Sequence, residues 1–194
     1  MLMGSSITIL SKYTARCLKY SGTWTKSDDL LILLGKTSLH SMNEYEKVIK
    51  VKKHIIHENY TIDGSENDIA IIILEEPVVF IEGIQPACIG FEDYEESLTT
   101  GWAADGDLTP ISLYTDGNEK CIGSNGNSTY CAVYGNDIGV CPSYGGIHAA
   151  RHANTWHLHG IRYADPSDRG PCFDNTVIYT DINSYIDWIV KYIN

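Results

Sequence analysis

The chain has 194 residues and a formal net charge of −11, so its length fits one ordinary domain. With 43% hydrophobic and 20% charged residues it can bury a core, which excludes a disordered or fibrous chain. The negative charge argues against nucleic acid or an anionic membrane as the main partner, because both repel an acidic surface. No apolar run approaches the roughly 20 residues of a membrane helix. No repeat or linker marks an internal boundary, so we expect one domain over residues 1–194.

Short apolar runs bounded by turn residues predict strands. In chain order these runs are residues 30–34, 48–56, 69–74, 78–81, 155–161 and 176–180. The one predicted helix follows Asp181, which can cap it, and its apolar residues recur at spacings of three and four from Ile182 to Ile193. Many short strands with a single terminal helix favour an all-β sandwich or barrel.

Cysteine and glycosylation patterns indicate an extracellular protein. Six cysteines occur without the CxxC spacing of zinc or redox sites, which is typical of disulfide-bonded secreted proteins. Two Asn-x-Thr sequons predict glycosylation at Asn59 and Asn127. The first ten residues lack the form of a signal peptide, because they have no positive start and Lys12 follows a short apolar stretch. We therefore expect a secreted protein whose signal peptide is not present in this chain.

Short motifs stand in a fixed order along the chain. In the N-terminal half they are Thr14-Ala-Arg-Cys17, Ile56-His-Glu-Asn-Tyr60, Asn67-Asp-Ile-Ala70, Leu74-Glu-Glu-Pro-Val78 and Ile84-Gln-Pro-Ala-Cys-Ile89. In the C-terminal half they are Gly101-Trp102, Tyr130-Cys-Ala132, Gly139-Val-Cys141, Gly145-Gly146, Trp156-His-Leu-His-Gly-Ile161 and Val177-Ile-Tyr-Thr-Asp-Ile182. Together, in this order, they resemble the trypsin-like (chymotrypsin-fold) serine protease domain. The C-terminal motifs are most similar to arthropod modular or clip-type proteases.

The resemblance implies an all-β fold of two packed β-barrels with a C-terminal helix. It also implies that the domain is truncated at its N-terminus, so that the N-terminal barrel is incomplete. By resemblance, Cys121–Cys131 and Cys141–Cys172 form disulfides. Cys17 and Cys88 are then unpaired in this chain, because their usual partners lie in upstream segments, and we expect a fragment of a longer precursor.

The catalytic positions of this family are degenerate. Catalysis needs a serine nucleophile, a histidine base and an aspartate that orients the histidine. Arg16 stands where the base belongs, and an arginine that stays protonated cannot accept a proton. The nucleophile motif is shortened to Cys141-Pro-Ser-Tyr-Gly-Gly146, so that Tyr144 takes the serine position. Asp68 is retained. We therefore expect no catalytic residue among Arg16, Asp68 and Tyr144.

Other functional elements of the family are also altered. Ser143 takes the place of the aspartate that pairs with a freed N-terminal amine, and Gly139 lies near the position that sets the charge of the substrate pocket. An alternative is that Ser143 is a displaced nucleophile. Asp68 is interpreted as a structural residue. A more specific hypothesis is that Asp68 forms a buried ion pair with Arg16.

Four histidines lie within twelve residues, at His148, His152, His157 and His159. A zinc site is one interpretation; we favour the alternative, a solvated loop and strand surface, and predict no metal site. The acidic run Glu92–Glu96 is interpreted as a solvated loop.

These patterns predict a catalytically inactive serine protease homologue that works by binding in an extracellular protease cascade, including arthropod innate immunity. Its expected partners are an active protease or the substrate or zymogen of that protease, with no cofactor, nucleic acid or membrane. Two alternatives stay open: a trypsin-like serine endopeptidase with an atypical active site, and a defective fragment without function.

Overall fold

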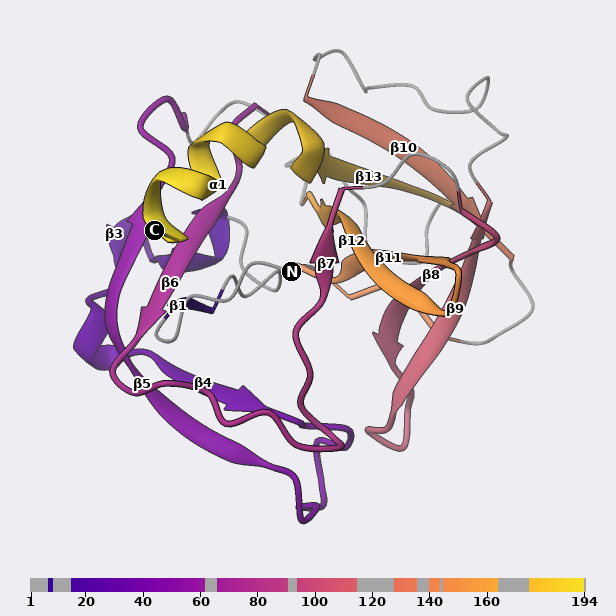
Figure 1. Cartoon of the computed structure of the whole chain (residues 1–194), viewed down its shortest axis with the longest axis horizontal. Helices are drawn as coiled ribbons and strands as arrows, with labels where there is room; N and C mark the ends of the chain where they lie inside the picture. The colour runs from indigo at the N-terminus through magenta and orange to yellow at the C-terminus, as the bar shows by residue number, and fades with distance from the viewer. Residues whose placement is uncertain are drawn as a thin grey trace.

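The computed structural model describes residues 7–8, 15–61, 66–90, 94–114, 128–135, 140–143, 145–163 and 175–193. These residues form a mostly β protein of two halves, with one short helix at the C-terminal end (Figure 1). The elements of the N-terminal half are β1 (Ile7–Thr8), η1 (Ala15–Leu18), β2 (Lys19–Tyr20), β3 (Thr23–Trp24), η2 (Ser27–Asp29), β4 (Leu31–Leu34), β5 (Lys47–Ile56) and β6 (Ala70–Leu74). Those that follow are β7 (Cys88–Ile89), β8 (Glu96–Trp102), β9 (Leu108–Tyr114), β10 (Thr129–Tyr134), β11 (Ile147–His152), β12 (Thr155–Arg162), β13 (Thr176–Asp181), η5 (Ile182–Tyr185) and α1 (Ile186–Ile193).

The C-terminal half is a closed six-stranded barrel. Its strand order is β11-β8-β9-β10-β13-β12, and the pairing of β11 with β12 closes the circle. β7 adds to β12 as a parallel outer strand. Inside the barrel, alternate positions of β9, β10 and β13 form one apolar cluster that includes Ile111, Ala132 and Val177. This alternation is the period of two that a half-buried strand imposes on its sequence.

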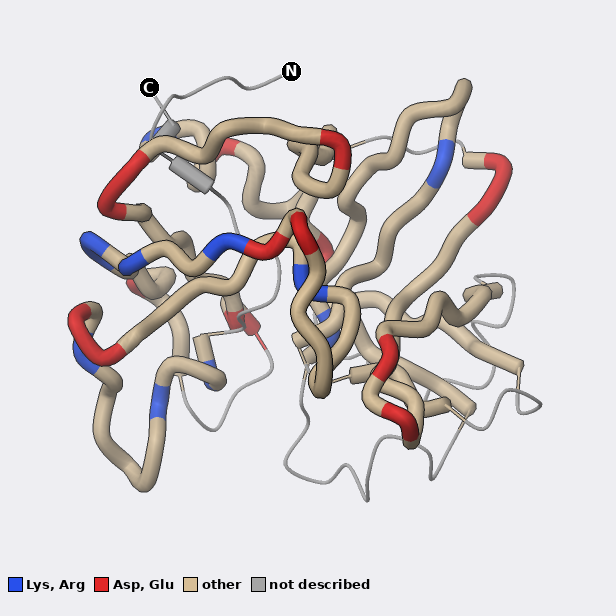
Figure 2. Tube along the Cα trace, turned by 90° about the horizontal axis from the view of Figure 1, so that it is seen from below, with Lys and Arg blue, Asp and Glu red and all other residues tan. Residues whose placement is uncertain are grey.

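The N-terminal half contributes a four-stranded sheet in the order β1-β6-β5-β4. Ile49 and Val51 of β5 are buried, whereas Lys50 and Lys52 between and beside them are exposed. β6 is apolar throughout and lies in the middle of the sheet, where both of its edges are paired. Acidic and basic positions are spread along the whole trace (Figure 2).

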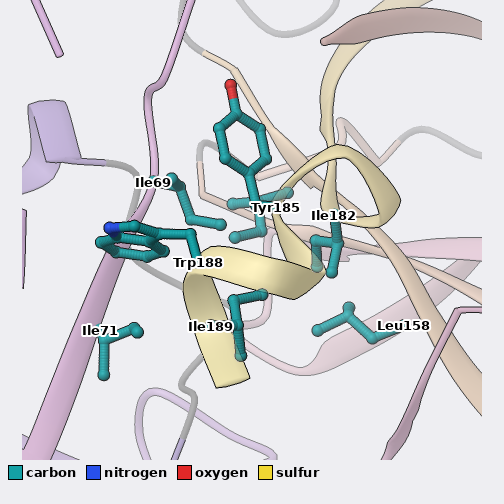
Figure 3. Close-up of a cluster of buried hydrophobic side chains, with 8 residues drawn as sticks. Ile69, Ile71, Leu158, Ile182, Tyr185, Trp188 and Ile189 are labelled. Carbon is teal, nitrogen blue, oxygen red and sulfur yellow. The ribbon is translucent and has the colours of Figure 1, made fainter. Parts of the chain in front are cut away.

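The C-terminal helix joins the two halves. Asp181 caps η5, because its Oδ1 accepts a hydrogen bond of 2.9 Å from the Asn183 N–H. One buried apolar cluster contains residues of the helical segment, of β6 with the residue before it, and of β12 (Figure 3). Its members are Ile182, Tyr185, Trp188, Ile189, Ile69, Ile71, Leu158 and Ile161. Burying side chains of this size is worth about 1.5–3 kcal/mol each, so the helix is fixed to the N-terminal half, beside β6 (Figure 1).

The structure confirms the predicted all-β fold with a C-terminal helix. One predicted strand is wrong: residues 78–81 form no strand, and Ile81 makes only an isolated bridge to Ile84. Val79 and Phe80 in this segment are exposed, so its apolar composition reflects no buried strand. The predicted helix is also shorter than expected, because its first four residues form the 3₁₀ turn η5.

Candidate functional site

Arg16 of η1 lies next to Asp68, which stands two residues before β6. The Arg16 backbone N–H donates to Oδ1 of Asp68 at 2.9 Å, and Asp68 is fully buried. Ala15 and Leu18 of η1 pack with Ala70 of β6, and this small core brings the two segments together. The arginine that the sequence predicts at the family's base position therefore contacts Asp68, and the contact shown between them uses the arginine backbone.

Aromatic side chains surround this pair. The charges of Asp68 and Arg16 both affect the pKa of Tyr60. The Tyr60 ring also contacts the Trp24 ring edge-on, with 6.2 Å between the ring centroids. Burial, reinforced by the negative charge of Asp68, raises the pKa of Tyr60 to about 12. The phenol therefore stays neutral near pH 7 and cannot serve as a base.

The segment around Ser143, which the sequence predicts to correspond to the family's nucleophile loop, is held by backbone and side-chain hydrogen bonds. Ser143 N–H donates to Thr100 at 3.0 Å, and Gly146 N–H donates to Ser143 at 2.9 Å. Gly146 in turn accepts a bond of 2.7 Å from the Arg162 N–H. The buried guanidinium of Arg162 also donates to the Pro142 carbonyl. Tyr144 and Gly139 lie outside the described residues.

Serine–histidine hydrogen bonds exist elsewhere in the described residues. Ser27 Oγ lies 3.0 Å from His54 Nδ1 at the surface of the N-terminal sheet, and burial lowers the pKa of that histidine. Ser97 Oγ lies 2.8 Å from Nε2 of His148 inside the C-terminal barrel. Neither pair was identified from the sequence, because the partners are 27 and 51 residues apart and no local motif joins them.

The surface interpretation of the histidine-rich segment is wrong for two of its members. His148 and His159 are 1% and 7% exposed, and their ring centroids lie 5.5 Å apart. Both alternate with small or apolar neighbours on strands whose inner face fills the barrel. Burial, followed by the charge of His159, lowers the pKa of His148 to about 3. No three metal-binding side chains come together among the described residues.

The remaining predicted site residues are placed as follows. Cys131 and Cys141 are disulfide-bonded, whereas Cys121 and Cys172 lie outside the described residues. Cys17 is exposed, and Cys88 is a half-buried free cysteine on β7. Asn59 is exposed in the turn that follows β5, and Asn127 lies outside the described residues.

A closed β-barrel, a second β-sheet and a C-terminal helix that joins them define the class of a trypsin-like serine protease domain. The chain matches the Trypsin family over residues 9–189 and belongs to it. Among relatives, it is 26% identical over 92% of its length to vitamin K-dependent protein C of Rattus norvegicus, and 27% identical over 84% of its length to that of Mus musculus. The chain spans 43% and 41% of these relatives, so it matches less than half of each. None of the described helices has the length and apolar character needed to cross a membrane.

Proposed function

We propose that this chain is a non-catalytic member of the trypsin family that works by binding. The proposal rests on the residue type at position 16. The Arg16 backbone N–H donates to Asp68 at 2.9 Å, which supports the assignment of Arg16 to the position of the family's histidine. In a working member, the residue beside the aspartate presents an imidazole to the nucleophile. A guanidinium in that position stays charged and has no lone pair to accept the serine proton. The neutral phenol of Tyr60 does not supply the missing base.

The tied loop at Ser143 supports the same proposal. An oxyanion hole needs backbone N–H groups directed at the reacting carbonyl. Here the Ser143 N–H donates to the Thr100 carbonyl, so it is not available to a substrate. The displaced-nucleophile interpretation of Ser143 would need this donor, and it would also need a base, but no base is hydrogen-bonded to Ser143 among the described residues.

As partners we propose an active protease, or the substrate or zymogen of that protease, in an extracellular cascade. Secretion, glycosylation at Asn59 and Asn127, and the disulfides Cys121–Cys131 and Cys141–Cys172 are parts of this proposal. It is supported by the exposure of Asn59 and by the bonded state of Cys131 and Cys141. Innate immunity is the proposed setting only through the resemblance to arthropod proteases.

The alternative function is a serine endopeptidase with an atypical site. The Ser27–His54 pair favours it, because both side chains are half-exposed and a neutral imidazole can take a serine proton. Binding and catalysis are separated by offering a mixed peptide library to the wild type and to Ser143→Ala and Ser27→Ala variants, with trypsin as the positive control. We expect no cleavage by any form of the chain.

Cleavage by the wild type that one alanine variant abolishes would establish the endopeptidase instead. The binding half of the proposal is tested by surface plasmon resonance of the folded chain against a panel of trypsin-family proteases, their zymogens and their protein substrates. Saturable binding that heat-unfolded chain does not reproduce is the expected result. Absence of binding across proteases, zymogens and their protein substrates would overturn it.

A further inference from the structure

The C-terminal barrel holds a polar network where a hydrophobic core is usual. His148 of β11 has a hydroxyl at each ring nitrogen: Ser97 Oγ at 2.8 Å from Nε2 and Tyr130 OH at 2.5 Å from Nδ1. Its exposed fraction is 1%. The network belongs to neither the Arg16–Asp68 pair nor the loop at Ser143, and the proposed function makes no use of it.

The hydroxyls suit the neutral ring. A neutral imidazole has one N–H donor and one acceptor nitrogen, and a hydroxyl can complement either. A protonated ring has two donors, so Ser97 and Tyr130 would both have to accept and send their own protons elsewhere. In an interior of low polarity a charge without compensating partners is costly.

Among the described residues, the other groups around His148 do not supply a compensating charge next to its ring. His159 on β12 lies 5.5 Å away, and Tyr179 on β13 lies 5.4 Å away. Tyr94, which precedes β8, meets both imidazoles edge-on at 6.0 and 5.2 Å. The carboxylate of Asp181, at the end of β13, affects His159 instead. It raises the pKa of His159, whereas burial and the charge of His157 lower that pKa.

The charged side chains on β11 and β12 bond to partners other than His148. Arg151 of β11 pairs with Glu96 of β8 at 2.9 Å on the exposed side. The guanidinium of Arg162 on β12 bonds the Pro142 carbonyl and acts on Tyr179. These cations would repel, not stabilise, a positive charge on His148.

We propose that the Ser97–His148–Tyr130 network, together with His159, is an acid-sensitive latch that opens the barrel along β11 when its imidazoles take up protons. β11 is the strand whose pairing with β12 closes the barrel, and the register of that pairing is irregular between His148 and Ala149. β11 carries His148 and is paired on one edge with β8, which carries Ser97, and on the other with β12, which carries His159. Protonation of the two imidazoles therefore acts on β11 at both of its edges.

Opening at β11 also releases the degenerate nucleophile loop. β11 begins at Ile147, directly after Gly146, whose N–H and carbonyl bond Ser143 and Arg162. Loss of β11 from the barrel removes the anchor of these bonds. Mild acid would thus change the shape of the surface around Ser143 while the N-terminal sheet stays folded.

The test is urea unfolding of the full chain between pH 7.5 and 4.5, together with amide hydrogen exchange. Each histidine that is neutral when folded and protonated when unfolded raises the unfolding equilibrium constant about tenfold per pH unit below its unfolded pKa. The Ser97→Ala/His148→Leu double variant should lose about one such factor of ten per unit. The His40→Gln variant changes an exposed histidine and should keep the wild-type slope.

Two results would overturn the latch. One is a double variant with the wild-type pH slope; the other is loss of amide protection in β5 and β6 together with β8 and β11, which would mean ordinary acid unfolding. Should the double variant not fold, ¹H–¹⁵N spectra of the wild-type imidazoles give the answer. A His148 ring that is neutral in the closed barrel, with a second set of protonated signals that grows below pH 6 as β11 loses protection, agrees with the latch. A ring that stays neutral to pH 4.5 without any opening, or a ring protonated at pH 6 in the closed barrel, contradicts it.

Discussion

Arg16 and His148 show what single residues reveal before the structure is known. The chemistry of Arg16 follows from its side chain alone, since a guanidinium is no base at any ordinary pH. The role of His148 depends on where the strand pairing puts it. Its hydroxyl partners come from β8 and β10, 51 and 18 residues away, and the sequence therefore favoured a surface position that the structure contradicts.

Asp68 should be important for the stability of the fold. Asp68→Ala removes a fully buried acceptor of the Arg16 N–H, and leaving that donor unsatisfied costs about 1–3 kcal/mol. Asp107→Ala, at an exposed position, should change the free energy of unfolding by less than about 0.5 kcal/mol. Urea unfolding measures both, and equal midpoints would contradict the structural role of Asp68.

At the scale of elements, patterns predicted strands where branched apolar residues are dense. The runs that became β4, β5, β6, β12 and β13 were located to within a residue or two at each end. The missed strands β8, β9, β10 and β11 contain no two adjacent Val, Ile or Leu residues, so none of them shows the continuous apolar run of a buried strand. They form because the barrel pairs both of their edges, a long-range effect that local propensity does not contain.

The turn between β4 and β5 depends on one ammonium group. Lys36 Nζ donates to the Ser41 carbonyl at 3.1 Å and to both carboxylate oxygens of Glu46 at 3.2 Å. The side chain of Glu46 is only 5% exposed, so this pair is shielded from solvent. Lys36→Ala should cost about 1–2 kcal/mol and speed proteolysis within residues 36–46. The exposed Lys52→Ala variant should do neither; matching cleavage rates would contradict this role.

The C-terminal helix is held by one directional bond as well as by packing. Trp188 Nε1 donates to Oε2 of Glu58 at 2.8 Å, and its ring lies 4.9 Å from that of His57. Trp188→Phe keeps much of the ring but loses the bond and leaves space, so we expect a loss of about 1–3 kcal/mol. Trp156→Phe, at a 39% exposed position, is the control. Thermal unfolding of both variants measures the difference, and an unchanged midpoint for Trp188→Phe would show that packing alone fixes the helix.

At the scale of the whole molecule, the order of the motifs predicted the family better than any one of them. The double-barrel fold followed from that order, whereas the position of the helix followed from its apolar spacing after Asp181. The Trypsin family match over residues 9–189 confirms the family. The buried Ser97–His148 contact and the Arg162–Pro142 bond could not be predicted, because each joins segments that only the folded barrel brings together. The proposal of binding rather than cleavage rests on the trypsin-family fold together with the residue types Arg16 and Tyr144.

The most direct test of a non-catalytic trypsin-family protein is labelling with a fluorophosphonate probe, which forms an adduct only with an activated serine. The folded chain, expressed through a secretory pathway, is compared with trypsin at equal concentration, and labelled sites are mapped by mass spectrometry. We predict no labelling of the chain above that of its heat-unfolded form. Stoichiometric labelling of Ser143, Ser27 or any other serine would contradict the proposal and show that the protein is an enzyme.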